Sequence, residues 1–239
     1  MSFKEQLFAG QTILVTGATQ GIGAGIANYL HSLGARVVAA GLGAEQSVLH
    51  PQIEVKLVDV SDAASVQSLF DGDEPLHHVV NCAGVIRRQA EHQLDVFEQV
   101  LDINLTGTMR VCSGARAKLK DSGGTIVNMA SMLSFFGGSL VPAYAASKGG
   151  VAQLTKSLAL AYAADGIRVN AVAPGWIATP LTQDLQNDAA RSGAILSRTP
   201  LNRWGTPDDI AHAVAFLCSG AASFMTGVIL PVDGGYLVA

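Results

Sequence analysis

The chain has 239 residues, of which 49% are hydrophobic, and a formal net charge of −4 at pH 7. This length fits one α/β domain, expected to span residues 1–239, with a sizeable buried core. The negative charge and the lack of a basic cluster exclude electrostatic attraction to nucleic acid or an anionic membrane, and charges or glycines interrupt every apolar run before the roughly 18 residues of a membrane span.

The amino-terminal segment and the cysteines indicate the compartment. Residues 1–10 carry Lys4 and Glu5 and have no apolar core, so no secretory signal is expected. The chain has three widely spaced cysteines, Cys82, Cys112 and Cys218. An odd number at this spacing is typical of a reducing compartment and of neither a disulfide framework nor a zinc site. We therefore predict a cytoplasmic protein that holds no metal.

Apolar segments typical of buried strands alternate with segments of helical periodicity. Strands are expected at residues 12–16, 36–40, 54–58, 78–81, 125–128, 168–173 and 228–232. Helices are expected at residues 22–33, 63–70, 97–120 with a possible break, 143–164 and 207–217. The alternation predicts an α/β fold of the Rossmann type, a doubly wound parallel sheet in a single domain.

Two connecting segments depart from the regular alternation. Residues 41–52 are short and turn-rich, which predicts a brief or irregular second crossover helix. Residues 175–205 lack a strand pattern and are long for a connection, which is typical of an active-site lid. Helix starts are indicated at Ser61-Asp62 and at Thr206-Pro207, where a capping residue precedes acids or a proline.

A glycine-rich loop, residues 16–23, joins the first strand to the first helix. Its glycines allow a tight turn and close backbone approach, and free N–H groups at the helix start attract an anion. The spacing is G-x-x-x-G-x-G, and the alternative is an ordinary strand-to-helix turn. We assign to the pyrophosphate of a dinucleotide the loop residues Gly17, Thr19, Gln20, Gly21, Ile22 and Gly23.

Tyr144 and Lys148 stand four positions apart, so a helix would place them on one face, with Ser131 thirteen residues upstream of Tyr144. An ammonium beside a phenol is expected to lower its pKa from about 10. That would make a proton donor and acceptor suited to carbonyl reduction or alcohol oxidation. Taken alone, the spacing also fits a helix with a packed tyrosine and an exposed lysine.

Together these motifs resemble the short-chain dehydrogenase/reductase family, and the resemblance extends over almost the whole chain. It includes Asn81-Cys82-Ala83-Gly84, with a cysteine where the family usually has a second asparagine, and the ending Val232-Asp233-Gly234-Gly235. The resemblance implies further cofactor contacts from Asp59, Val60, Asn81, Ala83, Gly84, Pro174, Gly175, Ile177 and Thr179. For Asp59, the alternative is a capping acid before Ser61.

The same resemblance implies the catalytic roles. Tyr144 would be the acid and base, and Lys148 would lower its pKa and bind the nicotinamide ribose. Ser131 would hydrogen-bond the substrate oxygen. Asn104 would hold a water that links Lys148 to solvent, the alternative being a helix break at that residue.

The end of the second strand bears on the choice of dinucleotide. It has Gly41 where NAD enzymes commonly place an acid, Glu45 comes a few residues late, and no basic residue lies between Val37 and Lys56. Gln20 stands where NADP enzymes often have a cation. Burying a phosphate dianion without a cation is costly, so we predict NAD, although the sequence leaves NADP open.

Within the family, the stretch Val85-Ile86-Arg87-Arg88 resembles the sugar-acid dehydrogenases, which implies a secondary alcohol or ketone on an acid. Arg87 and Arg88 could pair with a carboxylate, or form surface or intersubunit ion pairs instead. Weaker candidates are Arg191, Arg198 and Arg203. The alternatives are a 3-oxoacyl thioester reductase, another alcohol dehydrogenase or a non-catalytic dinucleotide sensor. Besides the small-molecule substrate, the resemblance implies self-association as a tetramer or dimer.

Overall fold

A seven-stranded parallel sheet forms the centre of the computed structural model, which describes residues 3–43 and 48–239. The strands are β1 (Thr12–Thr16), β2 (Arg36–Gly41), β3 (Glu54–Leu57), β4 (His78–Asn81), β5 (Thr125–Met129), β6 (Arg168–Pro174) and β7 (Ile229–Val232). Their order is β3-β2-β1-β4-β5-β6-β7. The order reverses direction between β1 and β4, where such sheets bind ligands at their carboxyl ends. The predicted doubly wound sheet is confirmed.

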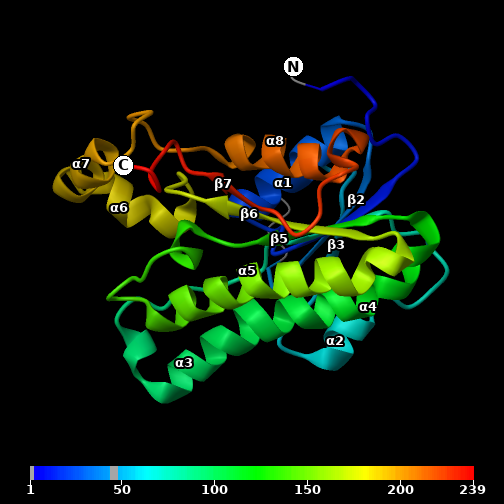
Figure 1. Ribbon diagram of the computed structural model, residues 1–239, viewed down its shortest axis with the longest axis horizontal. Helices are drawn as coiled ribbons and strands as arrows, with labels where there is room; N and C mark the ends of the chain where they lie inside the picture. The colour runs from blue at the N-terminus through cyan, green and yellow to red at the C-terminus, as the bar shows by residue number, and fades with distance from the viewer. Residues whose placement is uncertain (1–2, 44–47) are drawn as a thin grey trace.

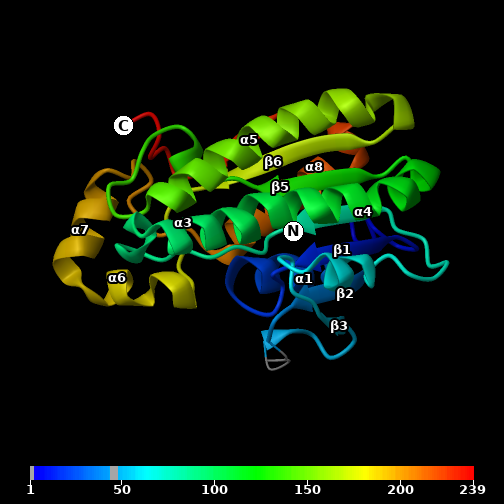
Figure 2. The same ribbon diagram turned by 90° about the horizontal axis from the view of Figure 1, so that it is seen from below.

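Helices cover both faces of the sheet. They are α1 (Gly21–Ser32), α2 (Ala63–Gln67), α3 (Leu94–Leu101), α4 (Gly107–Ser122), α5 (Pro142–Tyr162), α6 (Gln183–Asn187), α7 (Ala189–Ser197) and α8 (Pro207–Cys218). Figure 1 shows α1 and α8 on one face and α2, α4 and α5 on the other. In the view from below, α6 and α7 project past the end of the sheet (Figure 2). This projection places them over the edge where a site is expected.

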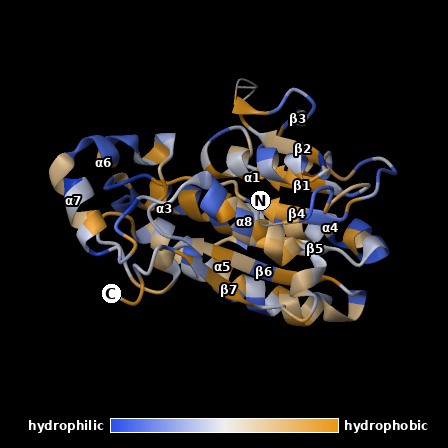
Figure 3. Cartoon of the chain, turned by 90° about the horizontal axis from the view of Figure 1, so that it is seen from above, coloured by the Kyte–Doolittle hydropathy of each residue, from blue (hydrophilic) through white to orange (hydrophobic). Residues whose placement is uncertain are grey.

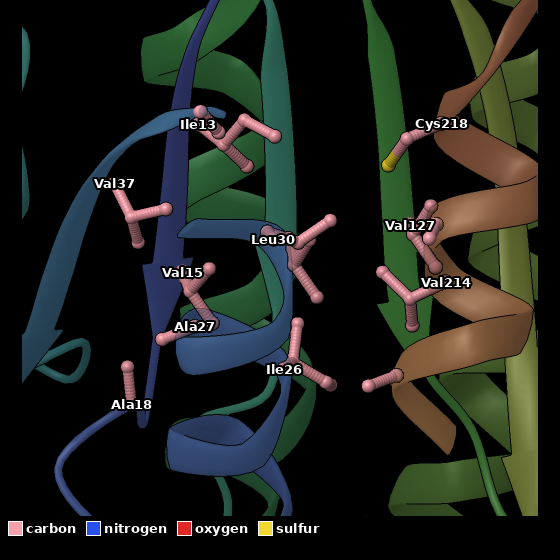
Figure 4. Packing of buried hydrophobic residues seen from close by; sticks show 14 of the residues in the cluster. Ile13, Val15, Ala18, Ile26, Ala27, Leu30, Val37, Val127, Val214 and Cys218 are labelled. Atoms are coloured by element: carbon pink, nitrogen blue, oxygen red, sulfur yellow. The ribbon is translucent and has the colours of Figure 1, made fainter. Parts of the chain in front are cut away.

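The core follows from the apolar strands. Residues of β1, α1 and α8 such as Val15, Leu30 and Val214 are fully buried against one another (Figure 4). Apolar residues are concentrated along the sheet, and polar ones along the outer helices (Figure 3). Among residues 3–43 and 48–239, none of the helices combines the length and apolarity needed to span a membrane.

Several element boundaries differ from the sequence prediction. The helix predicted at residues 97–120 begins earlier, at Leu94, and is broken by a π-helical turn at Asp102–Thr106. Helix α2 stops at Gln67, before the predicted residue 70. In the second crossover, residues 44–47, and with them Glu45, lie outside the described residues, and the flanking residues 41–43 and 48–52 hold no α-helix. The predicted lid contains two short helices, α6 and α7. They bury apolar residues such as Leu185 and Ile195.

Candidate active site

The three predicted proton-transfer residues meet at the carboxyl end of β5. Ser131 follows β5, while Tyr144 and Lys148 stand in the first turns of α5. Proline at the first position of α5 favours a helix start there, because its fixed φ suits the helix and it has no N–H to leave unpaired. The Lys148 Nζ lies 5.5 Å from the centre of the Tyr144 ring and donates a hydrogen bond of 2.7 Å to the Met129 carbonyl. The predicted pairing of phenol and ammonium on one helix face is therefore present.

The electrostatics of this pair differ from the sequence expectation. Burial lowers the pKa of Lys148 to about 8, since its ammonium is removed from water without a carboxylate partner. Burial also raises the pKa of Tyr144, and the nearby Ser131 hydroxyl and the Arg88 guanidinium act in the opposite direction. The net shift in the pKa of Tyr144 is therefore upward, and a lowering of this pKa by Lys148 stays a prediction. The ammonium faces the Met129 carbonyl and the ring.

Asn104 lies inside the π-helical turn, and its side chain is fully buried. Its Oδ1 accepts a hydrogen bond of 2.8 Å from the Val85 amide, and its Nδ2 donates to the Val85 carbonyl at 2.9 Å and to the Ser147 hydroxyl at 3.1 Å. The side chain therefore ties the loop after β4 to α5. Such π-helical turns are frequent at functional sites. The proton relay through Asn104 stays a prediction.

Glu91 is a buried residue that the sequence interpretation missed. It is 1% exposed, its Oε1 accepts a hydrogen bond of 2.7 Å from the Arg87 amide, and its Oε2 accepts one of 2.8 Å from the Tyr144 amide. The second bond satisfies a free N–H in the first turn of α5, where the helix dipole also favours a negative charge. Glu91 thus joins the backbone before Arg88 to the backbone of Tyr144.

Replacing Glu91 with glutamine should lower kcat by about tenfold, the equivalent of about 1.4 kcal/mol in the barrier. The amide can accept at only one atom, so either the Arg87 or the Tyr144 amide loses its acceptor and the phenol shifts. Steady-state kinetics check this, together with dinucleotide titration, which should show little change. Glu98→Gln on the exposed face of α3 is the control. A wild-type kcat in Glu91→Gln would contradict the positioning role.

The glycine loop has the features of a phosphate cradle. Gly17 adopts φ +63°, and a Cβ there would lie 2.6 Å from the Ala83 backbone, so this loop and the loop after β4 are in direct contact. Gln20 at the start of α1 makes no side-chain capping bond, and the first turn of α1 contains no acid. Uncapped N–H groups at a helix start suit a pyrophosphate. The residues present therefore fit a dinucleotide.

Other predicted cofactor residues border the same edge. The Asp59 carboxylate accepts hydrogen bonds from the Ser61 amide and hydroxyl at 2.8 and 2.6 Å, which lower its pKa. Asn81 is buried, and its Nδ2 donates a hydrogen bond of 2.9 Å to the Asn128 Oδ1. A Cβ on Gly84 would lie 3.7 Å from the Lys148 Nζ. The remaining predicted contacts follow the ends of β3, β4 and β6: Val60, Ala83, Pro174, Gly175, Ile177 and Thr179.

A cavity of about 340 Å³ lies beside Ser131 and Tyr144 and reaches the lid helices. Only some of the predicted arginines line this cavity. Arg88 and Arg191 line the cavity, whereas the Arg87 side chain is exposed outside it. Arg203 is paired with Asp209, its Nη1 lying 2.7 Å from Oδ2. Arg198 packs against the rings of Tyr236 and Phe136 at 4.3 and 5.5 Å. The substrate role predicted for Arg87 therefore lacks support from its position.

Burial makes the cysteine nearest the site unreactive. It raises the pKa of the Cys82 thiol to about 11, so a thiolate nucleophile is not available at neutral pH. Among the described residues, no group of three or more His, Cys, Asp and Glu side chains is placed to hold a metal ion. Ser131, Tyr144 and Lys148 stay the predicted proton-transfer residues.

Comparison with known proteins gives consistent matches along the chain. Residues 17–237 match the family model described as enoyl-(acyl carrier protein) reductase. The chain is 40% identical to 2-dehydro-3-deoxy-D-gluconate 5-dehydrogenase of Bacillus subtilis (strain 168), over 95% of each chain. It is 41% identical to cis-4-hydroxycyclohexanecarboxylate dehydrogenase of Sinomonas cyclohexanicum, over 97% of this chain and 98% of the relative.

A solved structure agrees with these matches. It comes from Agrobacterium tumefaciens, carries the name 2-deoxy-D-gluconate 3-dehydrogenase and holds NADP. It is 42% identical, with a TM-score of 0.92, and the alignment covers 99% of this chain and 100% of that one.

Proposed function

Because the chain belongs to the short-chain dehydrogenase/reductase family, whose members are NAD(P)-dependent oxidoreductases, we propose that it interconverts a secondary alcohol and a ketone on a carboxylic acid. The acid would be a sugar acid or a similar polar hydroxy or keto acid. The observation that carries the proposal is a cavity that holds Ser131 and Tyr144 together with the guanidinium of Arg88. The relatives named for a sugar acid and for a cyclic hydroxy acid support it, because both kinds of substrate carry a carboxylate.

The chain's own residues would handle the substrate oxygen and its proton. When bound, the nicotinamide supplies the exchange of a hydride with the carbinol carbon. Ser131 would hold the substrate oxygen by a hydrogen bond, and Tyr144 would donate a proton to it in reduction or accept one in oxidation. Lys148, with its pKa lowered to about 8, would bind the ribose and compensate negative charge on the phenol oxygen.

Arg88 is the proposed carboxylate partner, so Arg88→Ala should raise KM for an acid substrate by about tenfold or more and KM for a neutral alcohol far less. Arg87→Ala is the matched control, since its side chain lies outside the cavity. Steady-state kinetics on the two substrates separate these variants. Equal effects of Arg88→Ala on both substrates, or equal effects of the two variants, would count against the proposal.

NAD is the proposed physiological dinucleotide. The support is Gly41 and the lack of a lysine or arginine between Val37 and Lys56, whereas a relative's structure with NADP points the other way. We expect kcat/KM to be higher with NAD than with NADP by about tenfold, since an unpaired phosphate dianion is costly to bury. Initial rates with both dinucleotides check this, and a clear preference for NADPH refutes it.

A spectrophotometric screen tests the substrate class. Hydroxy and keto acids, polyols and acyl thioesters would be offered with both dinucleotides. Turnover confined to acyl thioesters would favour the alternative of a 3-oxoacyl reductase, and no turnover with dinucleotide bound would favour a sensor.

Self-association into a tetramer or dimer is also proposed. Its support is large apolar residues left exposed on the outer helices and loops, among them Leu160 at 84% and Phe224 at 105%. Sedimentation at micromolar concentration checks this, and a monomer throughout would refute it. The cytoplasm is the proposed compartment, supported by the three unpaired cysteines, and fractionation of the source cells checks it.

A further inference from the structure

The lining of the cavity is mostly apolar. Beyond the residues assigned to the nicotinamide, it is formed by Leu133, Phe136, Leu140, Val141, Leu181 and Leu185. These side chains come from the loop after β5 and from the lid. Apolar walls favour a hydrocarbon and offer no hydrogen bonds to a hydroxyl group.

Part of the polar lining of the cavity is engaged, while the Trp176 Nε1 has no hydrogen-bond partner among the described residues. The Thr182 hydroxyl donates to the Ile177 carbonyl at 2.7 Å, and the Thr179 and Thr182 hydroxyls lie 3.4 Å apart. Ser131 and Tyr144 are assigned to the reacting oxygen. Few side-chain groups remain for further hydroxyls of a polyol, and each buried hydroxyl without a partner costs about 1–3 kcal/mol.

Two guanidinium groups in the cavity provide positive charge that can bind an anion. Arg88, after β4, and Arg191, in α7, both line the cavity. Within the described residues neither side chain has an ion pair or a hydrogen bond to another residue, unlike Arg203, which is paired with Asp209. The charge of Arg88 opposes the rise in the pKa of Tyr144 that burial causes, so it acts at the reacting phenol. An anionic group between Arg88 and Arg191 would compensate both charges.

We propose that the preferred substrate is a hydroxy carboxylic acid whose body, between the alcohol and the carboxylate, is a hydrocarbon ring or chain rather than a polyol. The carboxylate is held by Arg88 and Arg191, and the alcohol lies at Ser131 and Tyr144. The deprotonated form of Tyr144 would take the proton of the alcohol, and bound oxidised NAD(P) would accept the hydride, which leaves the ketone and the reduced dinucleotide. This inference rests on the proposed interconversion of an alcohol and a ketone on a carboxylic acid, and it favours an acid with a hydrocarbon body over the sugar acid named there.

The test compares kcat/KM for three alcohols with oxidised NAD and NADP: cis-4-hydroxycyclohexanecarboxylate, gluconate and cyclohexanol. We expect the cyclic acid to exceed gluconate and cyclohexanol by about tenfold or more, the factor that one unpaired hydroxyl or one lost ion pair explains. A preference for gluconate overturns the inference and leaves the proposed function intact. A preference for cyclohexanol over both acids overturns the proposed function itself.

A variant tests the second arginine. Arg191→Gln should raise KM for the cyclic acid by about tenfold, with a much smaller effect on cyclohexanol and on kcat. Arg87→Gln is the control, because it removes an exposed guanidinium outside the cavity. Equal KM values for the acid in Arg191→Gln and Arg87→Gln would remove Arg191 from the site.

Discussion

Replacing Tyr144 with phenylalanine should reduce kcat by about a thousandfold, because general acid and base catalysis contributes roughly 10²–10⁴. The substitution removes the hydroxyl alone. The ring remains 5.5 Å from the Lys148 Nζ, and the backbone bond to Glu91 is preserved. Dinucleotide affinity should therefore change little. Single-turnover kinetics measure the chemical step, and fluorescence titration measures binding.

Tyr162→Phe supplies the matched control for this variant. Tyr162 is a buried tyrosine at the other end of α5, and Arg116 lies 4.5 Å above its ring. Its variant should keep wild-type kcat. If Tyr144→Phe kept near-normal turnover, another group would be the acid and base, and the assignment of the site would fail.

Gly17→Ala should unfold the protein at a lower temperature and weaken dinucleotide binding by about tenfold or more. The φ of +63° costs an alanine roughly 1–2 kcal/mol, and the added Cβ would lie 2.6 Å from the Ala83 backbone, which cannot move without displacing β4. A total loss of about 3 kcal/mol corresponds to a decrease in Tm of roughly 6–12 °C for a chain of this size.

Gly10→Ala separates the cost of a positive φ from the cost of the contact with Ala83. Gly10 has a φ of +75°, but a Cβ there would meet nothing within 4 Å. Its variant should lose only the conformational part, about 1–2 kcal/mol, and should bind the dinucleotide normally. Thermal unfolding of both variants checks this, and equal decreases in Tm would show that the contact with Ala83 is unimportant.

The sequence predicted the parts of the molecule that depend on local pattern. Apolar runs such as residues 12–16 revealed the strands, and the four-residue spacing of Tyr144 and Lys148 revealed their common helix face. Contacts between residues far apart in the chain leave no such pattern in the sequence. Glu91 reads as one loop acid among many, and its role depends on a helix start 53 residues away. The pKa of Tyr144 depends on burial, and the difference between Arg87 and Arg88 depends on the course of a loop.

The bridge made by Glu91 has a consequence for how substrate preference could diverge in related chains. Its carboxylate holds main-chain amides, which every residue except proline provides. Side chains at 87 and 88 can therefore be exchanged for others without disturbing the anchor beneath the phenol. Substrate selectivity can therefore change at this loop while the residues proposed for proton transfer stay the same.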